Sequence, residues 1–485
     1  MPDAPPSPAP SDAAVPRAGG ASYRVVRALA RRLLRFAYRR VEVEGVEHVP
    51  AAGPLLVVAN HQNALVDSLA LLDALPRPAG PLAKAPLFRV PVIGRLMRGV
   101  GAVPVFRPQD AAENDGRGAR ANVEILEACS ARLRAGEALV LFPEGASHAG
   151  PRLLPLRTGA ARIALDAGVP VTVLPVGLVF EHGGRRRGTA LVRFGPPIRV
   201  DGGAVAPAGR RAAVVATTRA MEAALKAAVA EADSHADLAA MAVLDGVLAQ
   251  ARGEAADAPL ATRHAGVRRL ARALPALRQA DPAALDALRA STTAYARTLD
   301  AVGLDAAHAD AAYTPAKVLR FLLVNAARLV VLGPLALVAA VATWPARALG
   351  DVVALRRGPA AEDVVVLYRI LGQSVVLVAW TVLAATALAI VVAPWAGLAA
   401  LVALPALFAL HLAWRDARAD AAARVRAFLL LAGGRLRDDL RAQRDALVAQ
   451  VDAARARLVA AGVPLEARAE APTDAPDGPD RPPSR

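Results

Sequence analysis

The stretch LLVVANHQNALVDSLALLDAL, Leu55–Leu75, contains the pattern that decides the fold of this chain. The apolar run Leu55–Asn60 predicts a buried strand, and Ala64–Leu75 predicts a helix. His61 and Asp67 lie at the junction between them, with five residues in between. Parallel sheets place their ligand-binding loops after the carboxyl ends of strands. This junction is therefore a first candidate for a functional site.

The alternation of strands and helices continues beyond this stretch. Further strands are predicted at Ala138–Phe142, Val171–Val176 and Ala190–Phe194, and helices at Ala119–Leu133 and Gly159–Ala167. Such alternation is typical of an α/β fold, with a mostly parallel sheet flanked by helices. We predict this domain over residues 41–204.

The regions on either side of this domain differ from it in composition and in predicted secondary structure. Residues 1–20 and 462–485 are rich in Pro and Ala and read as a disordered leader and tail. Residues 21–40 predict a basic amphipathic helix, which either lies on an anionic membrane surface or packs on its own domain. Residues 205–316 predict a helical insert of about four helices, without a catalytic constellation.

Residues 317–414 contain three candidate membrane segments. Residues 374–392 and 397–414 are uncharged, are long enough to cross a bilayer, and are close enough together to form a hairpin. Residues 321–344 contain Arg328 and a Gly-Pro break, so this segment is predicted to be tilted, re-entrant or interfacial. Residues 415–461 predict one or two charged amphipathic helices, broken at Gly433-Gly434.

The positions of arginines predict the topology of these segments. A loop predicted at residues 345–372 and the stretch after residue 414 are both rich in arginine, which favours the cytoplasmic side for each. A single full crossing by 321–344 would place the N-terminal domain outside. We therefore expect that this segment does not cross once, and that the catalytic domain is cytoplasmic, on the inner membrane. The arginines concerned are Arg347, Arg356, Arg357, Arg369, Arg415, Arg418, Arg424 and Arg426.

Composition excludes several classes of protein. The 58 Lys and Arg against 43 Asp and Glu give a net charge of +15, which suits an anionic ligand or surface. No zinc-finger spacing, clear helix-turn-helix or basic stripe with aromatic residues supports a nucleic-acid partner. The lone Cys129 excludes an internal disulfide framework. No histidine cluster predicts a metal site.

Four short blocks carry the candidate chemistry, and each has an ordinary structural explanation when taken alone. If a bend in the loop brings His61 to Asp67, the carboxylate orients an imidazole that can remove a proton from a hydroxyl. The other blocks are GAVPVFR, which ends at Arg107, FPEGASH around Glu144, and VTVLPVGLVFE around Pro175. Taken singly, the four blocks are explained by a capped loop, a surface salt bridge, a turn with an exposed acid and a buried strand.

The order of these blocks resembles the glycerolipid acyltransferase family, which includes lysophosphatidic acid acyltransferases. The resemblance covers roughly residues 41–200, and AKAPLFRVPVIG and LRTGAARIAL are also typical of it. One departure is that five residues, not four, separate His61 from Asp67. This spacing resembles a branch with fungal-type glycerol-3-phosphate and dihydroxyacetone-phosphate acyltransferases, which also carry hydrophobic segments after the acyltransferase domain.

The resemblance implies direct acyl transfer from acyl-CoA or acyl carrier protein to a glycerol-phosphate acceptor, with no further cofactor. His61 is then the general base and Asp67 its orienting partner. Arg107 is implied to bind the acceptor phosphate, and Glu144 with Gly145 to position the acceptor. Lys84 and Arg157 are weaker phosphate candidates. Membrane lipids are the expected partners, while transfer to another lysophospholipid and a non-catalytic membrane scaffold remain the alternatives.

Overall fold

The computed structural model describes residues 18–106, 119–181, 187–254, 258–304, 315–357, 362–431 and 434–462. The predicted leader at 1–20 and tail at 462–485 lie almost entirely outside these ranges, and Arg107 lies outside them as well.

Within the described residues, eight strands form one sheet in the order β1-β7-β6-β2-β5-β3-β4, with β8 paired to β6. Neighbours are parallel except for β6 with β7 and β6 with β8, which are antiparallel. The predicted mostly parallel sheet is therefore confirmed. The strands are β1 (Arg40–Glu44), β2 (Leu55–Ala59), β3 (Gly80–Lys84), β4 (Val103–Val105), β5 (Ala138–Leu141), β6 (Pro170–Phe180), β7 (Thr189–Phe194) and β8 (Ile198–Asp201).

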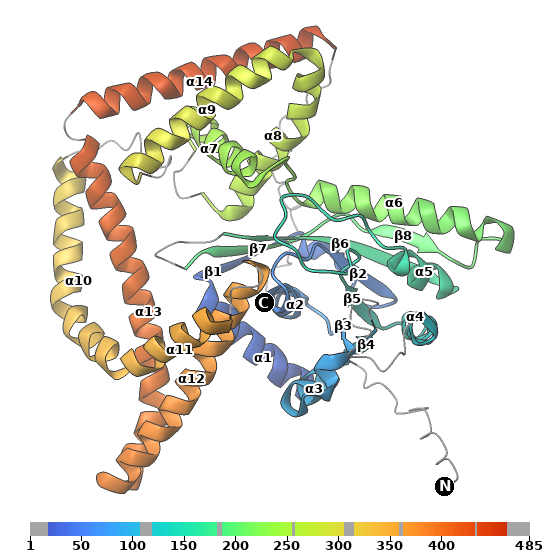
Figure 1. Cartoon of the computed structure of the whole chain (residues 1–485), viewed down its shortest axis with the longest axis horizontal. Helices are drawn as coiled ribbons and strands as arrows, with labels where there is room; N and C mark the ends of the chain where they lie inside the picture. The colour runs from blue at the N-terminus through green and yellow to red at the C-terminus, as the bar shows by residue number, and fades with distance from the viewer. Residues whose placement is uncertain are drawn as a thin grey trace, which may run out of the picture.

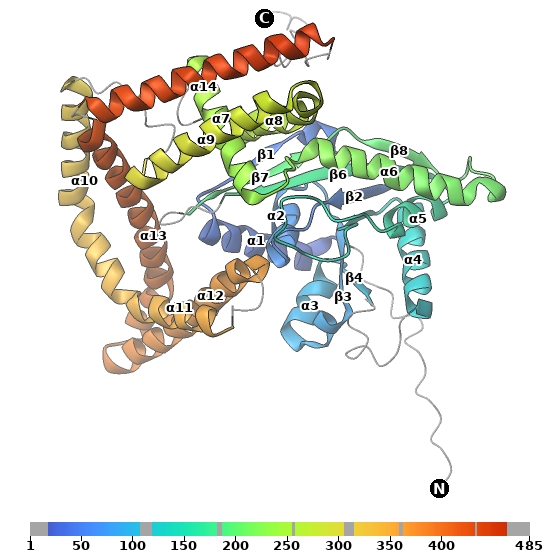
Figure 2. The same cartoon turned by 45° about the horizontal axis from the view of Figure 1, so that its top comes forward.

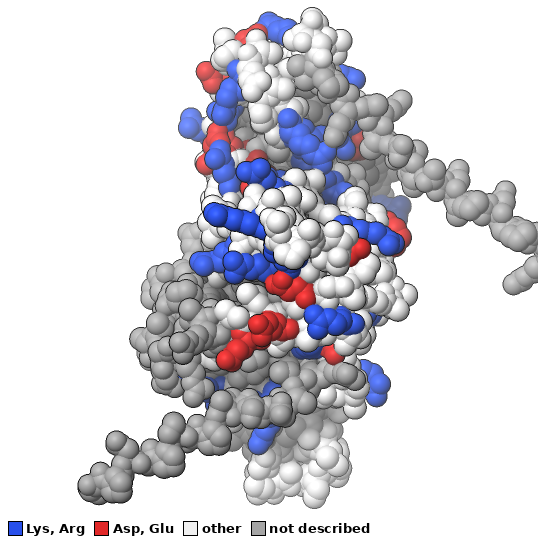
Figure 3. All heavy atoms as spheres, turned by 90° about the vertical axis from the view of Figure 1, so that its right-hand side faces the viewer, with Lys and Arg blue, Asp and Glu red and all other residues white. Residues whose placement is uncertain are grey.

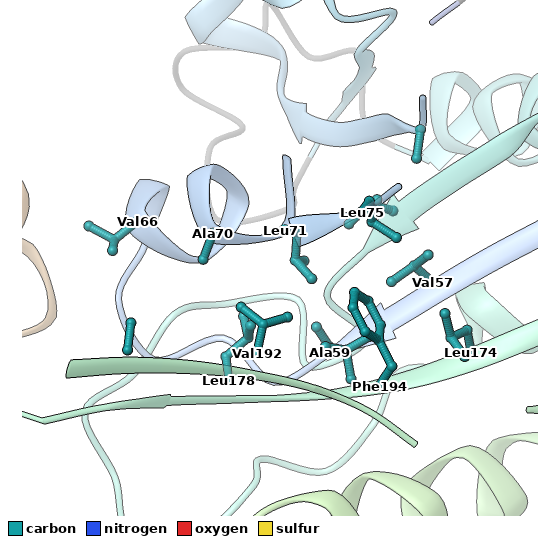
Figure 4. Close-up of a cluster of buried hydrophobic side chains, with 14 of the residues drawn as sticks. Val57, Ala59, Val66, Ala70, Leu71, Leu75, Leu174, Leu178, Val192 and Phe194 are labelled. Atoms are coloured by element: carbon teal, nitrogen blue, oxygen red, sulfur yellow. The ribbon is translucent and has the colours of Figure 1, made fainter. Parts of the chain in front are cut away.

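Helices cover both faces of this sheet (Figures 1 and 2). On one face, α1 (Gly20–Ala37) and α2 (Leu65–Ala74) pack against Leu55, Val57 and Ala59 of β2, in the core shown in Figure 4. On the other face, α4 (Ala119–Arg134), α5 (Gly159–Asp166) and α6 (Arg210–Ala228) pack against Leu56 and Val58. Because both faces of β2 are covered, its whole run is apolar, as expected for a central parallel strand.

The helix α1 is the predicted basic amphipathic helix, and it packs on its own domain. It buries Tyr23, Val26, Ala30 and Leu34 along one stripe. The helix α3 (Pro91–Gly99) lies beside it, after the short turns η1 (Val46–His48) and η2 (Ala85–Arg89).

A second apolar core lies in the helical region that was predicted as an insert. The turn η4 (Pro207–Gly209) leads into α6, and α7 (His235–Ala251), α8 (Leu260–Ala280) and α9 (Pro282–Val302) follow. Leu244, Tyr295 and Leu299 pack there with Leu431 and Leu447 from the C-terminal part of the chain. The region is therefore joined to the helices at the end of the chain rather than standing alone.

Three described helices are long and apolar enough to cross a membrane, at Leu319–Ala342, Gly372–Val391 and Pro394–Leu431. They belong to α10 (Pro315–Ala342), α12 (Glu362–Val391) and α13 (Pro394–Leu431). α12 and α13 form the predicted hairpin, and the lowest part of the face in Figure 3, where this hairpin ends in Figure 1, carries no charged side chains.

One prediction for this region is wrong. The stretch predicted as a loop at 345–372 begins with a helix, α11 (Trp344–Arg357), which packs along α12. The helices predicted over 415–461 are present as the last part of α13, which continues through residues 415–431 from the apolar run, and as α14 (Arg435–Ala460). The charge pattern changes at Trp414, but helix propensity does not, so the backbone continues without a break.

Polar and aromatic contacts attach the α/β domain to the middle of α13. The guanidinium of Arg187 donates through Nε to Asp416 Oδ2 at 2.7 Å, and Arg39 Nη1 lies 2.7 Å from Asp420 Oδ2. Phe36 of α1 stacks on Phe408 with ring centroids 5.3 Å apart. Asp416 is buried and fully paired, so this attachment is specific rather than a loose surface contact.

Candidate active site

The end of β2 is fixed by the side chain of Asn60, which forms two hydrogen bonds with the backbone of β6. Asn60 Nδ2 donates to the carbonyl oxygen of Leu178 at 3.0 Å, and the Leu178 N–H donates to Asn60 Oδ1 at 2.7 Å. Asn60 is fully buried. This pair continues the β2–β6 ladder by one step and determines where the following residue, His61, leaves the sheet.

The loop after β2 bends so that His61 and Asp67 are in contact, which is the condition under which the two residues can act as a catalytic pair. Their Nδ1 and Oδ2 atoms are 2.8 Å apart, and the backbone N–H of Asn63 donates to the same oxygen at 2.9 Å. Asp67 has no exposed surface and the His61 side chain is 14% exposed. The ring of His61 also stacks on Phe142, with centroids 4.0 Å apart. The imidazole is therefore held at one nitrogen and on one face, leaving Nε2 for a substrate.

The extra residue between His61 and Asp67 is accommodated by an unusual backbone at Ala64. Its φ of 47° is the one positive φ outside glycine in the described chain, and its ψ is −119°. Asn63 is a residue type that often caps helices, but here Ala64 is the N-cap and no side chain caps α2. Residues in such sparsely populated conformations persist where surrounding contacts fix them.

Burial dominates the electrostatics of Asp67. Loss of water raises the pKa of its carboxyl, while the hydrogen bonds from His61 and the Asn63 N–H oppose that rise. Tyr38 lies close enough for the Asp67 charge to add to the effect of burial, so the pKa of the Tyr38 hydroxyl is raised as well. Asp67 Oδ1 and Tyr38 Oη are both buried without a hydrogen-bond partner within the described ranges.

The buried carboxylate of Glu144 fixes the loop that carries His61 through hydrogen bonds to the backbone. Its Oε1 accepts the backbone N–H of His61 at 2.8 Å, and its Oε2 accepts the N–H of Leu154 at 2.7 Å. His148 Nε2 lies 2.6 Å from Oε2, and His148 Nδ1 accepts the Gly150 N–H at 3.0 Å. Since Nδ1 is an acceptor, Nε2 carries the proton that is donated to Glu144.

A cavity of about 630 Å³ opens in front of His61. Its walls are mainly apolar, with Leu82, Ile125, Leu141 and Phe142 among them, and three cations line it as well. The cations are Lys84, Arg157 and Arg162, all of them exposed. An elongated apolar group and an anion can therefore be bound in the same cavity as the imidazole.

The predicted site residues fall into three groups. His61, Lys84, Gly145 and Arg157 all line this cavity, and Asp67 lies directly behind His61. Glu144 is buried and does not line the cavity, and its hydrogen bonds go to the loop that carries His61. Arg107 lies outside the described residues.

The side chain of Arg157 occupies space that is open only because residue 145 is a glycine. Gly145 has a φ of 76°, and a Cβ there would lie 2.5 Å from Arg157 Nε. The Arg157 N–H also donates to the Pro143 carbonyl at 2.8 Å. The glycine of the FPEG block therefore leaves room for the arginine to cross this turn.

Sequence reasoning did not single out Phe142, His148, Arg162 or Tyr38. His148 had a signal, because it follows Glu144 by four residues within the quoted FPEGASH block. Arg162 had a weaker signal, because it follows the candidate Arg157 by five residues, near the start of a predicted helix. Tyr38 and Phe142 carried no such signal, since an aromatic residue next to an apolar run is usually core.

Comparison with known proteins places this site in a family. Residues 40–179 match the family model described as Acyltransferase. The 1-acyl-sn-glycerol-3-phosphate acyltransferase BAT2 of Brassica napus is 31% identical over 152 residues, covering 30% of this chain and 41% of that protein. Glycerol-3-phosphate O-acyltransferase 2 of Saccharomyces cerevisiae is 37% identical over 86 residues, covering 17% of this chain and 12% of that protein.

Among solved structures, the 1-acyl-sn-glycerophosphate acyltransferase PlsC of Thermotoga maritima is 22% identical, with a TM-score of 0.31, and covers 41% of this chain and 78% of that chain. The chain spans less than half the length of the two curated relatives just named. The matched region contains β1 to β5, most of β6 and the whole His61–Asp67 loop. Residues 40–179 are therefore an acyltransferase-family domain.

Proposed function

We propose that this protein transfers a fatty acyl group from a thioester donor to a hydroxyl of a glycerol-phosphate acceptor. The observation that carries the proposal is the His61–Asp67 pair, 2.8 Å apart, at the end of a largely apolar cavity with cations on its walls. The acceptors in view are glycerol-3-phosphate, dihydroxyacetone phosphate and 1-acylglycerol-3-phosphate, and the donors are acyl-CoA and acyl carrier protein. The names of the relatives support this class of acceptor.

His61 acts as the general base in this proposal. Its Nε2 takes the proton of the acceptor hydroxyl while the oxygen attacks the thioester carbonyl carbon. The carbon–sulfur bond then breaks, and the leaving thiolate takes up the proton from His61. Asp67 stabilises the imidazolium between these steps, and such proton transfer contributes about 10²–10⁴ in rate.

Direct transfer of the acyl group, without a covalent acyl-enzyme, is consistent with the position of the one cysteine in the sequence. The lone cysteine, Cys129, is fully buried on α4. Burial raises the pKa of its thiol to about 12, so it is a poor nucleophile at neutral pH. A thioester is already activated, which makes a covalent acyl-enzyme unnecessary.

The cavity walls indicate how the two substrates lie. Leu82, Ile125 and Leu141 provide apolar surface for the acyl chain, whereas Lys84 and Arg157 provide charge for the acceptor phosphate. A guanidinium offers two parallel donors to phosphate, so we assign Arg157 the closer contact. Arg162 is a further cation on the same wall.

We further propose that α10 enters the bilayer without crossing it. Trp380 Nε1 donates to the carbonyl oxygen of Ala342, the last residue of α10, at 2.9 Å. Trp380 lies six residues beyond Ser374, where the apolar part of α12 begins, and six residues correspond to about 9 Å. The hydrocarbon core is about 30 Å thick, so α10 ends well short of the far side. This keeps the catalytic domain on the cytoplasmic side.

The test is acyl transfer by the purified full-length chain in mixed micelles, with labelled acyl-CoA or acyl carrier protein and the three acceptors in competition. We expect His61→Ala to abolish transfer, while His235→Ala, at an exposed histidine that begins α7, retains wild-type rates. Both variants should melt like the wild type. Transfer by folded His61→Ala would refute the base, and wild-type protein inactive with every acceptor would favour a scaffold.

A further inference from the structure

We propose that a second cavity, between α10 and α13, binds the phosphate of an anionic phospholipid headgroup. This cavity has a volume of about 450 Å³ and shares no lining residue with the one in front of His61. The two helices run side by side in both views of the molecule (Figures 1 and 2). The proposal does not depend on the proposed acyl transfer.

The walls of this cavity carry an excess of positive charge. Arg320 and Arg328 come from α10 and Arg424 from α13. None of these three pairs with a carboxylate in the part of the chain that the structure describes. The one acid on the wall, Asp420, is 2.7 Å from Arg39 of the catalytic domain. Its charge is therefore compensated from outside the cavity, and the three guanidiniums remain available for an anion.

The hollow exists because small residues occupy one wall. Ala417 and Ala421 lie one turn apart on α13, opposite Phe321 and Val324 of α10. Arg320 and Arg328 are two turns apart on α10, so they flank this hollow from above and below. A phosphate seated against the alanines would be within reach of long arginine side chains from both helices.

The height of the cavity on α13 indicates a membrane lipid rather than a soluble anion. The apolar run of α13 ends at Trp414, and the cavity is lined from Ala417 to Arg424. At 1.5 Å per residue it lies roughly 5 to 15 Å beyond the apolar run, a range that overlaps the headgroup layer. On α10, Leu329 is exposed at the end of the cavity nearer the apolar run and offers contact for an acyl chain.

Arg328 interrupts the apolar stretch Leu319–Ala342, of which only a small share is buried by the protein itself. Because the cavity lies beyond the apolar run of α13, this guanidinium is at the level of the lipid headgroups and not in the hydrocarbon core. An anionic lipid phosphate at that level attracts nearby basic side chains.

The experiment measures lipid retained by the delipidated full-length chain in detergent, by native mass spectrometry. The probes are phosphatidylglycerol and phosphatidylcholine with the same acyl chains, and inorganic phosphate as competitor. The test variants are the single changes Arg320→Gln, Arg328→Gln and Arg424→Gln, the triple variant that combines them, and the uncharged change Ala421→Leu, which fills the hollow. Arg418→Gln is the matched control, because Arg418 is exposed on α13 but does not line the cavity.

We expect wild-type protein to retain phosphatidylglycerol over phosphatidylcholine. Each single arginine change should weaken binding about tenfold, as expected for one charge-assisted hydrogen bond. The triple variant and Ala421→Leu should lose the preference while melting at the wild-type temperature, and Arg418→Gln should keep it. Retention by the triple variant, an equal loss in Arg418→Gln, or full displacement by millimolar inorganic phosphate would each overturn the proposal.

Discussion

Replacing Asp67 with Asn should lower activity and leave stability unchanged or improved. The substitution keeps the size of a side chain that has no exposed surface and removes its charge. The acyl-transfer reaction proposed above makes His61 positively charged, so the carboxylate 2.8 Å from Nδ1 stabilises the state that forms during the reaction. Asparagine keeps the accepting oxygen for the Asn63 N–H but loses that stabilisation.

The size of the activity loss follows from Coulomb's law. Two charges with centres about 4 Å apart, at an effective dielectric constant of about 20, attract each other by about 4 kcal/mol. If most of this attraction stabilises the transition state, its loss in the Asp67→Asn variant lowers kcat by about 10³-fold. KM for the acceptor should change little, because Asp67 does not line the cavity.

The stability of this variant should move in the opposite direction. Burial raises the pKa of Asp67, so between pH 3.8 and the folded-state pKa the native chain holds a proton that the unfolded chain has released. The contribution of Asp67 to the free energy of unfolding therefore decreases as pH rises through that window, and at neutral pH the buried charge is a cost. Asparagine removes this cost.

Steady-state acyl transfer and thermal melts at pH 4 to 8 test both statements. The isosteric change at an exposed acid, Asp438→Asn on α14, serves as the control and should alter neither quantity. Near-wild-type kcat in a folded Asp67→Asn protein would refute the orienting role. A large fall in melting temperature at neutral pH would show instead that the carboxylate is a net stabiliser.

Three further substitutions test other parts of the structure. Gly145→Ala should raise KM for a phosphate-bearing acceptor about tenfold, because its Cβ would displace Arg157, and an unchanged KM contradicts that role. Ala64→Gly should raise the free energy of unfolding by up to about 1 kcal/mol, since the φ of 47° costs glycine nothing, and a decrease on denaturant titration contradicts the strain. Burial lowers the pKa of His264 from 6.5 to about 4, so its contribution is present above pH 6.5 and up to about 3 kcal/mol is lost as pH falls towards 4. His264→Leu should remove that acid sensitivity in thermal melts at pH 7 and pH 4.5, and an unchanged slope would contradict this account.

The sequence predicted the elements whose burial is continuous. β2 and β5 were predicted within one residue at each end, because two covered faces leave an unbroken apolar run. β7 was predicted equally well, although Arg193 interrupts its apolar run. β1, β3, β4 and β8 were not predicted. They are short and partly exposed, and in β3 and β4 the pattern contains proline, which argues against a strand.

The candidate site was predictable in composition but not in arrangement. The order of the blocks identified the pair, but the sequence did not reveal the loop conformation that brings it together, with its positive φ at Ala64 and its hydrogen bonds to Glu144 and Asp67. Glu144 was predicted to position the acceptor, and its contacts with the loop were not foreseen. A single sequence does not reveal that distant N–H groups at His61 and Leu154 converge on its carboxylate. Non-local partners of this kind determine whether a buried acid is tolerated.

The length of α13 has a consequence for how substrates arrive. Its 38 residues correspond to about 57 Å, roughly twice the hydrocarbon thickness, and the ion pair of Asp416 with Arg187 attaches the catalytic domain two residues beyond Trp414. If the apolar run of α13 crosses the bilayer, as its length and composition allow, the domain is thereby held against the membrane surface. For the lipid acceptor proposed above, the relevant concentration is then its mole fraction in the membrane. We therefore expect that dilution of the vesicles in buffer leaves the rate per enzyme unchanged.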